Sequence, residues 1–238
     1  YSAAIPATNP ERVAAQELGV VELSYSEFLG ALAKEKKTIA VSGTNGKSTT
    51  TAMIAKILIE ADYDPTVILG TKSPDLNNSN LRIGKSDWLV IEACEHMANM
   101  LHIIPNIAVI TNIEEDHLDF YRDLDHITQT FQKWIDQMGV CGKTILNTTD
   151  KNSMTLNTTD PALFKVDDRT IDKGVQSFDV AGVPVELTIP GTFNAQNAAA
   201  ALTAAHLAGV QDDHALSSLK SFKGTWRRFE HIGKWKKA

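Results

Sequence analysis

The sequence predicts an α/β fold: a mostly parallel sheet with helices on both faces, plus a small antiparallel β addition. Continuous apolar runs at 88–91 and 107–110 fit strands that are buried on both faces, as in parallel sheets. Segments with helical patterns lie between such runs, which is the order of a layered α/β domain. Residues 151–190 change to short segments separated by Asp-Pro, Gly-Val-Pro and Pro-Gly, and we expect the antiparallel strands there.

The elements follow one another along the chain. Before residue 36 we expect a helix that ends near Gly19, a short strand at 20–23, and a helix at 24–34 with Ser26 as a possible N-cap. After it we expect strands at 38–42, 66–69, 88–91, 107–110 and 144–146, and helices at 47–61, 125–138, 194–208 and 213–222.

Composition excludes several classes of function. The chain has 238 residues, of which 43% are hydrophobic, and a net charge of -6. Its length and hydrophobic share support a globular core. The negative charge argues against nucleic acid and membrane surfaces as partners, because both favour basic proteins. No apolar run approaches the roughly 18 to 20 residues of a membrane span.

The two cysteines, Cys94 and Cys141, have no paired spacing. They therefore predict neither a disulfide framework nor a zinc site, and they suit a reducing compartment. We expect both as small side chains of the core, in a cytoplasmic protein.

The most informative segment is the glycine-spaced turn after the strand at 38–42. It contains, in order, Gly43, Thr44, Asn45, Gly46, Lys47, Ser48 and Thr49. Glycines allow the positive φ angles that turn successive backbone N–H groups toward one anion. Lys47 adds a cation, a Ser48 or Thr49 hydroxyl can ligate Mg²⁺, and the following helix directs its positive end to the same place. The pattern predicts a nucleotide phosphate site; the alternative is an ordinary turn.

Acidic residues follow the strand at 88–91. Glu92 stands where this strand ends, and Glu95 follows three residues later. Ligands of parallel sheets gather at the carboxyl ends of strands, so a carboxylate there can hold Mg²⁺ opposite the phosphate loop. Glu92 is the first candidate and Glu95 the second; alternatively, Glu92 is only the first polar residue after a buried strand.

The strand at 107–110 is followed by a polar cluster, 111–119, that contains His117 between acidic residues. An imidazole flanked by carboxylates can bind a metal or orient a phosphate. The position at a strand end favours this interpretation over a solvated turn.

Two later segments carry candidate ligand contacts. Asn194 and Asn197 open an alanine-rich helix, where their amides suit a purine edge, the tethering of a loop, or a helix cap. Arg227 and Arg228 lie between aromatic residues, where guanidinium groups can contact phosphate, stack, or form an exposed pair.

Together these motifs resemble those of the Mur ligase family, ATP-dependent enzymes of peptidoglycan synthesis that join a carboxylate to an amino acid. Within the family the resemblance is greatest to the branch that adds L-alanine to UDP-N-acetylmuramate. The family resemblance rests on the 43–49 loop, Glu92 at its strand end, the 111–119 cluster, Pro190-Gly191 with the two asparagines, and Arg227-Arg228-Phe229-Glu230. The resemblance to the alanine-adding branch rests on residues 1–5 with Asn9-Pro10-Glu11, on the segment from Arg82 to Glu95, and on the same Arg-Arg-Phe-Glu motif.

The resemblance implies a P-loop NTPase-like central domain that binds ATP and Mg²⁺. Lys47 and the loop amides would hold the β- and γ-phosphates, Ser48 and Glu92 one Mg²⁺, and His117 a second. Asn194 and Asn197 would meet the adenine, and Arg228 would contact the nucleotide. Some relatives use a carbamylated lysine beyond the histidine; Gln132 and Lys133 occupy that region here, so we do not carry this feature over.

The resemblance also implies a division of the chain. Residues 1–35 would be the end of a UDP-sugar-binding domain with its linker, 36–224 the central ATP-binding domain, and 225–238 the start of a C-terminal domain. With the flanking domains missing, we expect weak nucleotide binding without ligation. Two hypotheses stay open beside this one: another Mur-type or folylpolyglutamate synthase-like ligase, and a nucleotide-dependent binding module without ligation chemistry.

Overall fold

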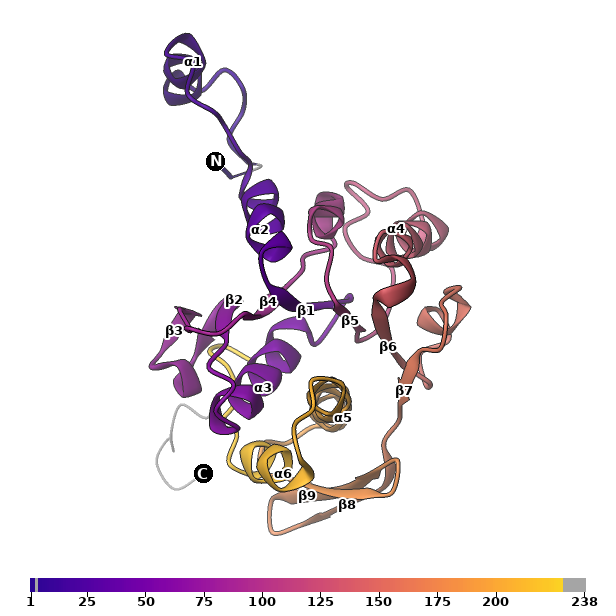
Figure 1. Cartoon of the computed structure of the whole chain (residues 1–238). Coiled ribbons are helices and arrows are strands. Elements are labelled where there is room, and N and C mark those ends of the chain that lie inside the picture. Colours follow the sequence, from indigo (N-terminus) through magenta and orange to yellow (C-terminus); the bar gives the residue numbers. More distant parts are fainter. Residues whose placement is uncertain (3, 229–238) are drawn as a thin grey trace, which may run out of the picture.

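A seven-stranded sheet forms the centre of the computed structural model, which describes residues 1–2 and 4–228 (Figure 1). Phe229, Glu230 and the rest of the chain that follows lie outside the described residues. The strand order is β3-β2-β4-β1-β5-β6-β7, and all neighbours are parallel except β2 and β3. The prediction of a mostly parallel sheet is therefore confirmed. The strands are β1 (Lys37–Ser42), β2 (Thr66–Ser73), β3 (Ser79–Arg82), β4 (Trp88–Glu92), β5 (Ile107–Ile110), β6 (Lys143–Asn147) and β7 (Ala162–Phe164).

Helices cover both faces of this sheet, as predicted. Helices α3, α5 and α6 lie on one face, and α2, η2 and α4 lie on the other (Figure 1). Because successive strand residues point to opposite faces, β1 sends Ile39 and Val41 into the first core and Ala40 into the second. The helices are α1 (Pro10–Glu17), α2 (Tyr25–Lys34), α3 (Lys47–Glu60), α4 (Leu124–Asp136), α5 (Thr192–Leu207) and α6 (Asp212–Lys220), with short 3₁₀ turns η1 (Pro74–Leu76), η2 (His96–His102), η3 (Gly139–Cys141) and η4 (Ser153–Thr155).

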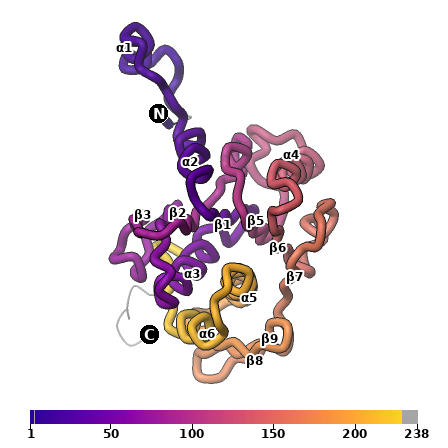
Figure 2. The backbone as a smooth tube through the Cα atoms, viewed as in Figure 1, coloured from indigo at the N-terminus to yellow at the C-terminus, as the bar shows by residue number. Residues whose placement is uncertain are grey.

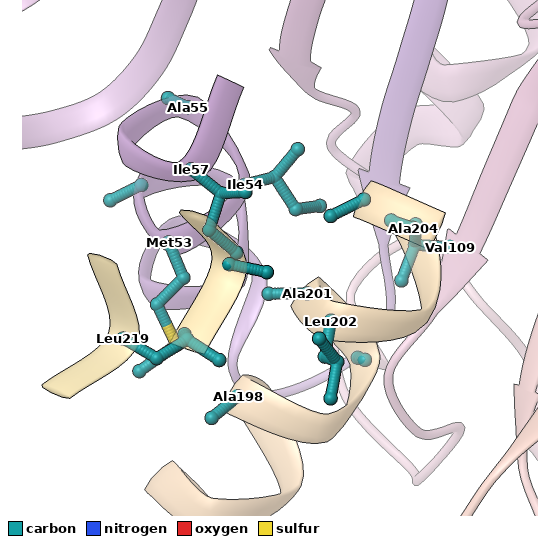
Figure 3. Close-up of a cluster of buried hydrophobic side chains, with 14 of the residues drawn as sticks. Met53, Ile54, Ala55, Ile57, Val109, Ala198, Ala201, Leu202, Ala204 and Leu219 are labelled. Carbon is teal, nitrogen blue, oxygen red and sulfur yellow. The ribbon is translucent and has the colours of Figure 1, made fainter. Parts of the chain in front are cut away.

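Helices α3 and α5 pack closely against each other. Figure 3 shows Ala198 and Ala201 of α5 close to the larger side chains of α3, among them Met53 and Ile57. All of these side chains are fully buried. Alanine adds little bulk between two helices, so their backbones can approach closely and interlock. This contact fixes the start of α3, which carries Lys47, relative to the start of α5.

A second, antiparallel sheet of three strands has the order β10-β9-β8, formed by β8 (Asp167–Asp172), β9 (Val175–Val180) and β10 (Val183–Leu187). Figure 2 shows the chain passing from β7 into this sheet and returning through α5 and α6. Phe178 and Leu187 belong to the same buried hydrophobic cluster as the side chains of α3, so the small sheet covers the outer side of that cluster. The antiparallel addition is confirmed, although β7, from the same part of the sequence, joins the main sheet in parallel.

Several local predictions were wrong. Residues 20–23 form no strand, and the N-cap of α2 is Ser24 rather than Ser26. The Ser24 hydroxyl accepts from the Glu27 amide at 3.2 Å, and the Glu27 carboxylate accepts from the Ser24 amide at 2.7 Å, which is a complete capping box. Helix α5 has Gly191 as its N-cap with φ 101°, so neither asparagine caps it.

Both cysteines are exposed, which corrects their assignment to the core. Cys94 follows the end of β4, and Cys141 lies in the 3₁₀ turn η3; neither belongs to a strand or helix face that packs inward. Over the described part of the chain, no helix combines the length and the apolar character that crossing a membrane requires.

Candidate nucleotide site

The glycine loop connects β1 to α3 and leaves no room for side chains at two positions. Gly43 and Gly46 have φ angles of 131° and 88°, a region that L side chains rarely adopt. A Cβ on Gly43 would lie 2.2 Å from Thr111 Oγ1, and a Cβ on Gly46 would lie 2.3 Å from Asn197 Oδ1. The two glycines therefore let three segments meet: the loop, the strand end at Thr111, and α5.

Asn112 holds the loop in shape. Its side-chain oxygen accepts from Asn45 N at 2.9 Å, and its amide nitrogen donates to Asn45 O at 3.0 Å. The Asn112 carbonyl accepts from Thr44 N at 3.0 Å, and Thr44 Oγ1 accepts from Glu114 N at 2.8 Å. The backbone N–H groups of Thr44 and Asn45 are therefore already bonded to Asn112 and are not available to bind an anion.

The amides that remain for an anion lie at the start of α3. The first helical bond runs from Thr50 N to Gly46 O at 2.9 Å, so the N–H groups of Lys47, Ser48 and Thr49 precede it and have no helical acceptor. Helix N-termini with such groups bind phosphates. The sequence predicted a phosphate site from these residues, and the fold directs them to the carboxyl edge of the sheet.

Lys47 extends back along the loop. Its Nζ donates to Gly43 O at 2.7 Å, to Thr44 O at 3.0 Å and to Glu95 Oε1 at 2.9 Å. Its side chain is 15% exposed. The cation is thus held at the phosphate loop by the loop backbone and by one buried carboxylate.

Glu92 lies at the end of β4 on the same side of the sheet. Its Oε2 accepts from the Gly70 amide of β2 at 2.8 Å. A Cβ on Gly70 would lie 2.8 Å from this oxygen and 3.0 Å from the Glu92 carboxyl carbon, so glycine is the residue that admits the carboxylate. Sequence reasoning missed Gly70, because nothing in the sequence shows that β2 pairs with β4.

His117 lies beyond Glu95, with its Nε2 3.5 Å from Glu95 Oε1 and 3.8 Å from Asp116 Oδ2. Glu95, Asp116 and His117 thereby place ligand atoms within 4.8 Å of one another. The His96 ring stacks on His117 with centroids 4.3 Å apart and planes 19° apart, and His96 Nε2 lies 3.2 Å from Asp119 Oδ2. His96, His117 and Asp119 therefore form a second group whose ligand atoms lie within 4.8 Å of one another. No sequence signal pointed to His96.

Asn194 and Asn197 link α5 to its surroundings, and both are buried. Asn197 Nδ2 donates to Asn194 Oδ1 at 3.3 Å, and Asn194 Nδ2 donates to Pro190 O at 2.7 Å. Asn197 Oδ1 accepts from Thr50 Oγ1 of α3 at 3.2 Å. The asparagines therefore tether two helices and a loop, and they also line the cavity described next.

One cavity of about 580 Å³ brings most of the predicted residues together. Of the predicted residues, Gly43, Glu95 and His117 do not line it: Glu95 accepts a hydrogen bond from Lys47, which does line it, and His117 lies beside Glu95. The residues lining it include Thr44, Asn45, Gly46, Lys47, Ser48, Thr49, Glu92, Asn194, Asn197, Arg227 and Arg228.

The arginine segment reaches this cavity because it is fastened to β2. Trp226 N donates to Lys72 O at 2.9 Å, and Thr71 Oγ1 donates to Trp226 O at 3.1 Å. These bonds carry Arg228, more than a hundred residues away along the chain from β2, to the edge of the sheet that bears Glu92.

The residues around the cavity fit ATP and Mg²⁺. A volume of about 580 Å³ lies within the range of small-ligand sites. The Ser48 hydroxyl and the Glu92 carboxylate are hard oxygen donors, which Mg²⁺ prefers. Buried Glu95 Oε2 has no hydrogen-bond partner within the described residues, as expected near a site that a ligand completes.

Gln132 has a structural role. Its Nε2 donates to Asp136 Oδ1 at 2.8 Å and to Asn157 O at 2.9 Å, and its Oε1 accepts from Asn157 N at 2.8 Å. These bonds tie α4 to the segment after η4.

A glycine loop, a lysine and a strand-end carboxylate around one cavity of a parallel sheet define an α/β domain of the nucleotide-binding class. A family model described as the Mur ligase middle domain matches residues 41–205. This chain therefore belongs to the Mur ligase family.

Individual relatives agree with this assignment. UDP-N-acetylmuramate--L-alanine ligase of Clostridium acetobutylicum is 39% identical over a match that covers 98% of this chain and 54% of that protein. The enzyme of the same name from Caldicellulosiruptor bescii is 36% identical over a match that covers 99% of this chain and 55% of that protein. The chain thus spans about half the length of the curated relatives it matches.

The fold agrees as well. The crystal structure of UDP-N-acetylmuramate-alanine ligase MurC from Thermotoga maritima matches with a TM-score of 0.85 and 27% identity, over 99% of this chain and 56% of that one. The ligase MPL from Neisseria meningitides matches with a TM-score of 0.80 at 23% identity, a likeness of fold.

Proposed function

We propose that this chain is the ATP-binding part of a ligase that joins L-alanine to UDP-N-acetylmuramate in peptidoglycan precursor synthesis. The observation that carries the proposal is the single cavity that unites Lys47, Ser48, Glu92, Asn194 and Arg228. Support for the two substrates comes from the names of the relatives. Because ATP is a substrate, we also propose a cytoplasmic location.

In such a reaction a substrate carboxylate attacks the γ-phosphorus of ATP and displaces ADP, which gives an acyl phosphate. An amine then attacks the acyl carbon and displaces phosphate, with loss of a proton from the amine. The protein contributes positioning and charge neutralisation. Lys47 and the amides at the start of α3 would bind the β- and γ-phosphates. Ser48 and Glu92 would hold one Mg²⁺ and His117 a second, and bound Mg²⁺ would neutralise phosphate charge.

The remaining contacts concern the nucleotide base and the junction of the chain. Asn194 and Asn197 would bind the adenine with the amide groups that the tethering bonds leave available, and Arg228 would contact the nucleotide.

The domain boundaries at 35 and 224 stay a prediction. Helix α1 has no buried residue and stands off the sheet in Figure 1, whereas α2 packs Leu29 and Ala33 onto it.

A chimera tests the proposal, in which this chain replaces the matching segment of the Clostridium acetobutylicum relative. Phosphate release and product formation are measured with ATP, UDP-N-acetylmuramate and a panel of amino acids. We expect turnover with L-alanine. In the Glu92→Gln chimera we expect the turnover rate to fall about 100-fold or more, because the Mg²⁺ that Glu92 would hold is bound more weakly and the phosphate charge of the transition state is left uncompensated. Glu186→Gln, which changes an exposed carboxylate on β10 outside the cavity lining, is the matched control.

The outcomes separate the hypotheses. A preference for another amino acid or for a folate acceptor would keep the ligase and overturn alanine. No product from any acceptor, with nucleotide binding intact, would favour the binding module. The 238-residue chain alone should bind nucleotide without alanine-dependent phosphate release, and release by it would contradict that part of the proposal.

A further inference from the structure

Glu95 is a buried carboxylate between two groups of the candidate site. Its side chain is 3% exposed, and burying a carboxylate without partners is costly. Oε1 accepts from Lys47 Nζ at 2.9 Å and lies 3.5 Å from His117 Nε2. Oε2 has no hydrogen-bond partner within the described residues. One carboxylate therefore connects the phosphate-loop lysine to the histidine.

The backbone beneath this carboxylate is held in place. The Glu95 carbonyl accepts from the Tyr121 hydroxyl at 2.5 Å and from the Ala98 amide at 2.9 Å. Tyr121 is 1% exposed, and its burial raises the pKa of its phenol to about 12, so it remains a donor. Glu95 is thus presented to Lys47 from a fixed position.

Lys47 is fully engaged when no nucleotide is bound. An ammonium group has three N–H donors, and the three acceptors around Nζ use all of them. A phosphate can therefore bind Lys47 only in exchange for one of these acceptors. Two are carbonyls of the loop itself; Glu95 is the charged one, and it comes from a different element.

We propose that Glu95 is a positioning residue, which holds Lys47 in the nucleotide-free protein and couples the binding of nucleotide phosphates to the binding of the divalent cation. This rests on the proposed function, which supplies ATP and Mg²⁺ as the ligands. When a nucleotide phosphate binds the Lys47 ammonium group, that group no longer pairs with the Glu95 carboxylate. The negative charge of Glu95 then favours the binding of a divalent cation beside His117. The coupling is reciprocal, as linkage requires.

The test uses the 238-residue chain, titrated calorimetrically with a non-hydrolysable ATP analogue, once in EDTA and once at saturating Mg²⁺. The quantity compared is the dissociation constant in EDTA divided by the dissociation constant at saturating Mg²⁺. In Glu95→Gln we expect nucleotide binding in EDTA to tighten about threefold to tenfold, because no ion pair of Lys47 with residue 95 has to be broken. We expect the ratio to fall about tenfold. Glu186→Gln, which removes an exposed charge from β10 in the small sheet, outside the cavity lining, should leave the ratio unchanged.

A purely structural role predicts a different result. If Glu95→Gln weakens binding equally in both conditions and keeps the wild-type ratio, the proposal is overturned. Glu95→Asp covers the case in which Glu95→Gln does not fold: it keeps the charge but is too short to reach both partners, so its ratio should also fall. Failure of the wild type to bind the analogue in either condition would instead overturn the proposed function.

Discussion

The phosphate loop at 43–49 and the acidic segment at 92–95 follow neighbouring parallel strands, yet they are built in opposite ways. The loop is held by backbone and amide hydrogen bonds, chiefly to Asn112. The acidic segment offers two carboxylates with few bonds each: Glu92 to Gly70, and Glu95 to Lys47. A rigid donor surface suits phosphates of constant shape, whereas lightly bound carboxylates can exchange partners when a cation arrives.

Lys47 joins the two regions, and its removal should have the largest effect. We expect Lys47→Ala to weaken nucleotide binding by about 100-fold or more, since one cation and its charge-assisted bonds are lost and Glu95 is left unpaired. Calorimetric titration measures the change. Lys151→Ala, at an exposed position, is the control. A change below about threefold would mean that the loop amides alone hold the ligand.

Asn112 tests the rigid region by itself. Asn112→Ala leaves the Asn45 amide without its partner, so we expect nucleotide binding to weaken about tenfold and the free energy of unfolding to fall by about 1–2 kcal/mol. Titration and denaturant unfolding measure the two effects. Asn80→Ala, on the exposed strand β3, should change neither. Wild-type affinity in Asn112→Ala would show that the loop keeps its shape without this side chain.

Gly70 tests the acidic region, with the smallest expected effect on nucleotide binding. Gly70→Ala brings a methyl group against Glu92, which we expect to cost about 1–3 kcal/mol of unfolding free energy. Nucleotide affinity in EDTA should stay within about threefold of wild type, because the phosphate loop is untouched. The Glu92→Ala background provides the check: without the carboxylate, the cost of Gly70→Ala should largely disappear.

Much of the site could be predicted from local patterns. The loop residues, Glu92 and Asn194 were predicted as strand ends or helix starts, and these are positions that a parallel sheet brings to one edge. The error at the N-cap of α2 was avoidable, because the sequence carries the distinguishing signal. Ser24 and Ser26 are equally good N-cap residues by type, but Glu27 stands three residues after Ser24, which is the spacing of a capping box.

The class of fold and the chemical character of the loop follow from short-range patterns in the amino-acid order, because buried parallel strands and glycine turns impose such patterns on the chain. The amino-acid order also carried the pattern by which residues 41–205 match the Mur ligase middle domain. The contacts between distant residues are visible in the folded chain alone: Gly70 with Glu92, Asn112 with Asn45, and Glu95 with both Lys47 and His117. Each of these contacts joins segments more than twenty residues apart, and pairings at that range depend on strand order, which local patterns do not encode.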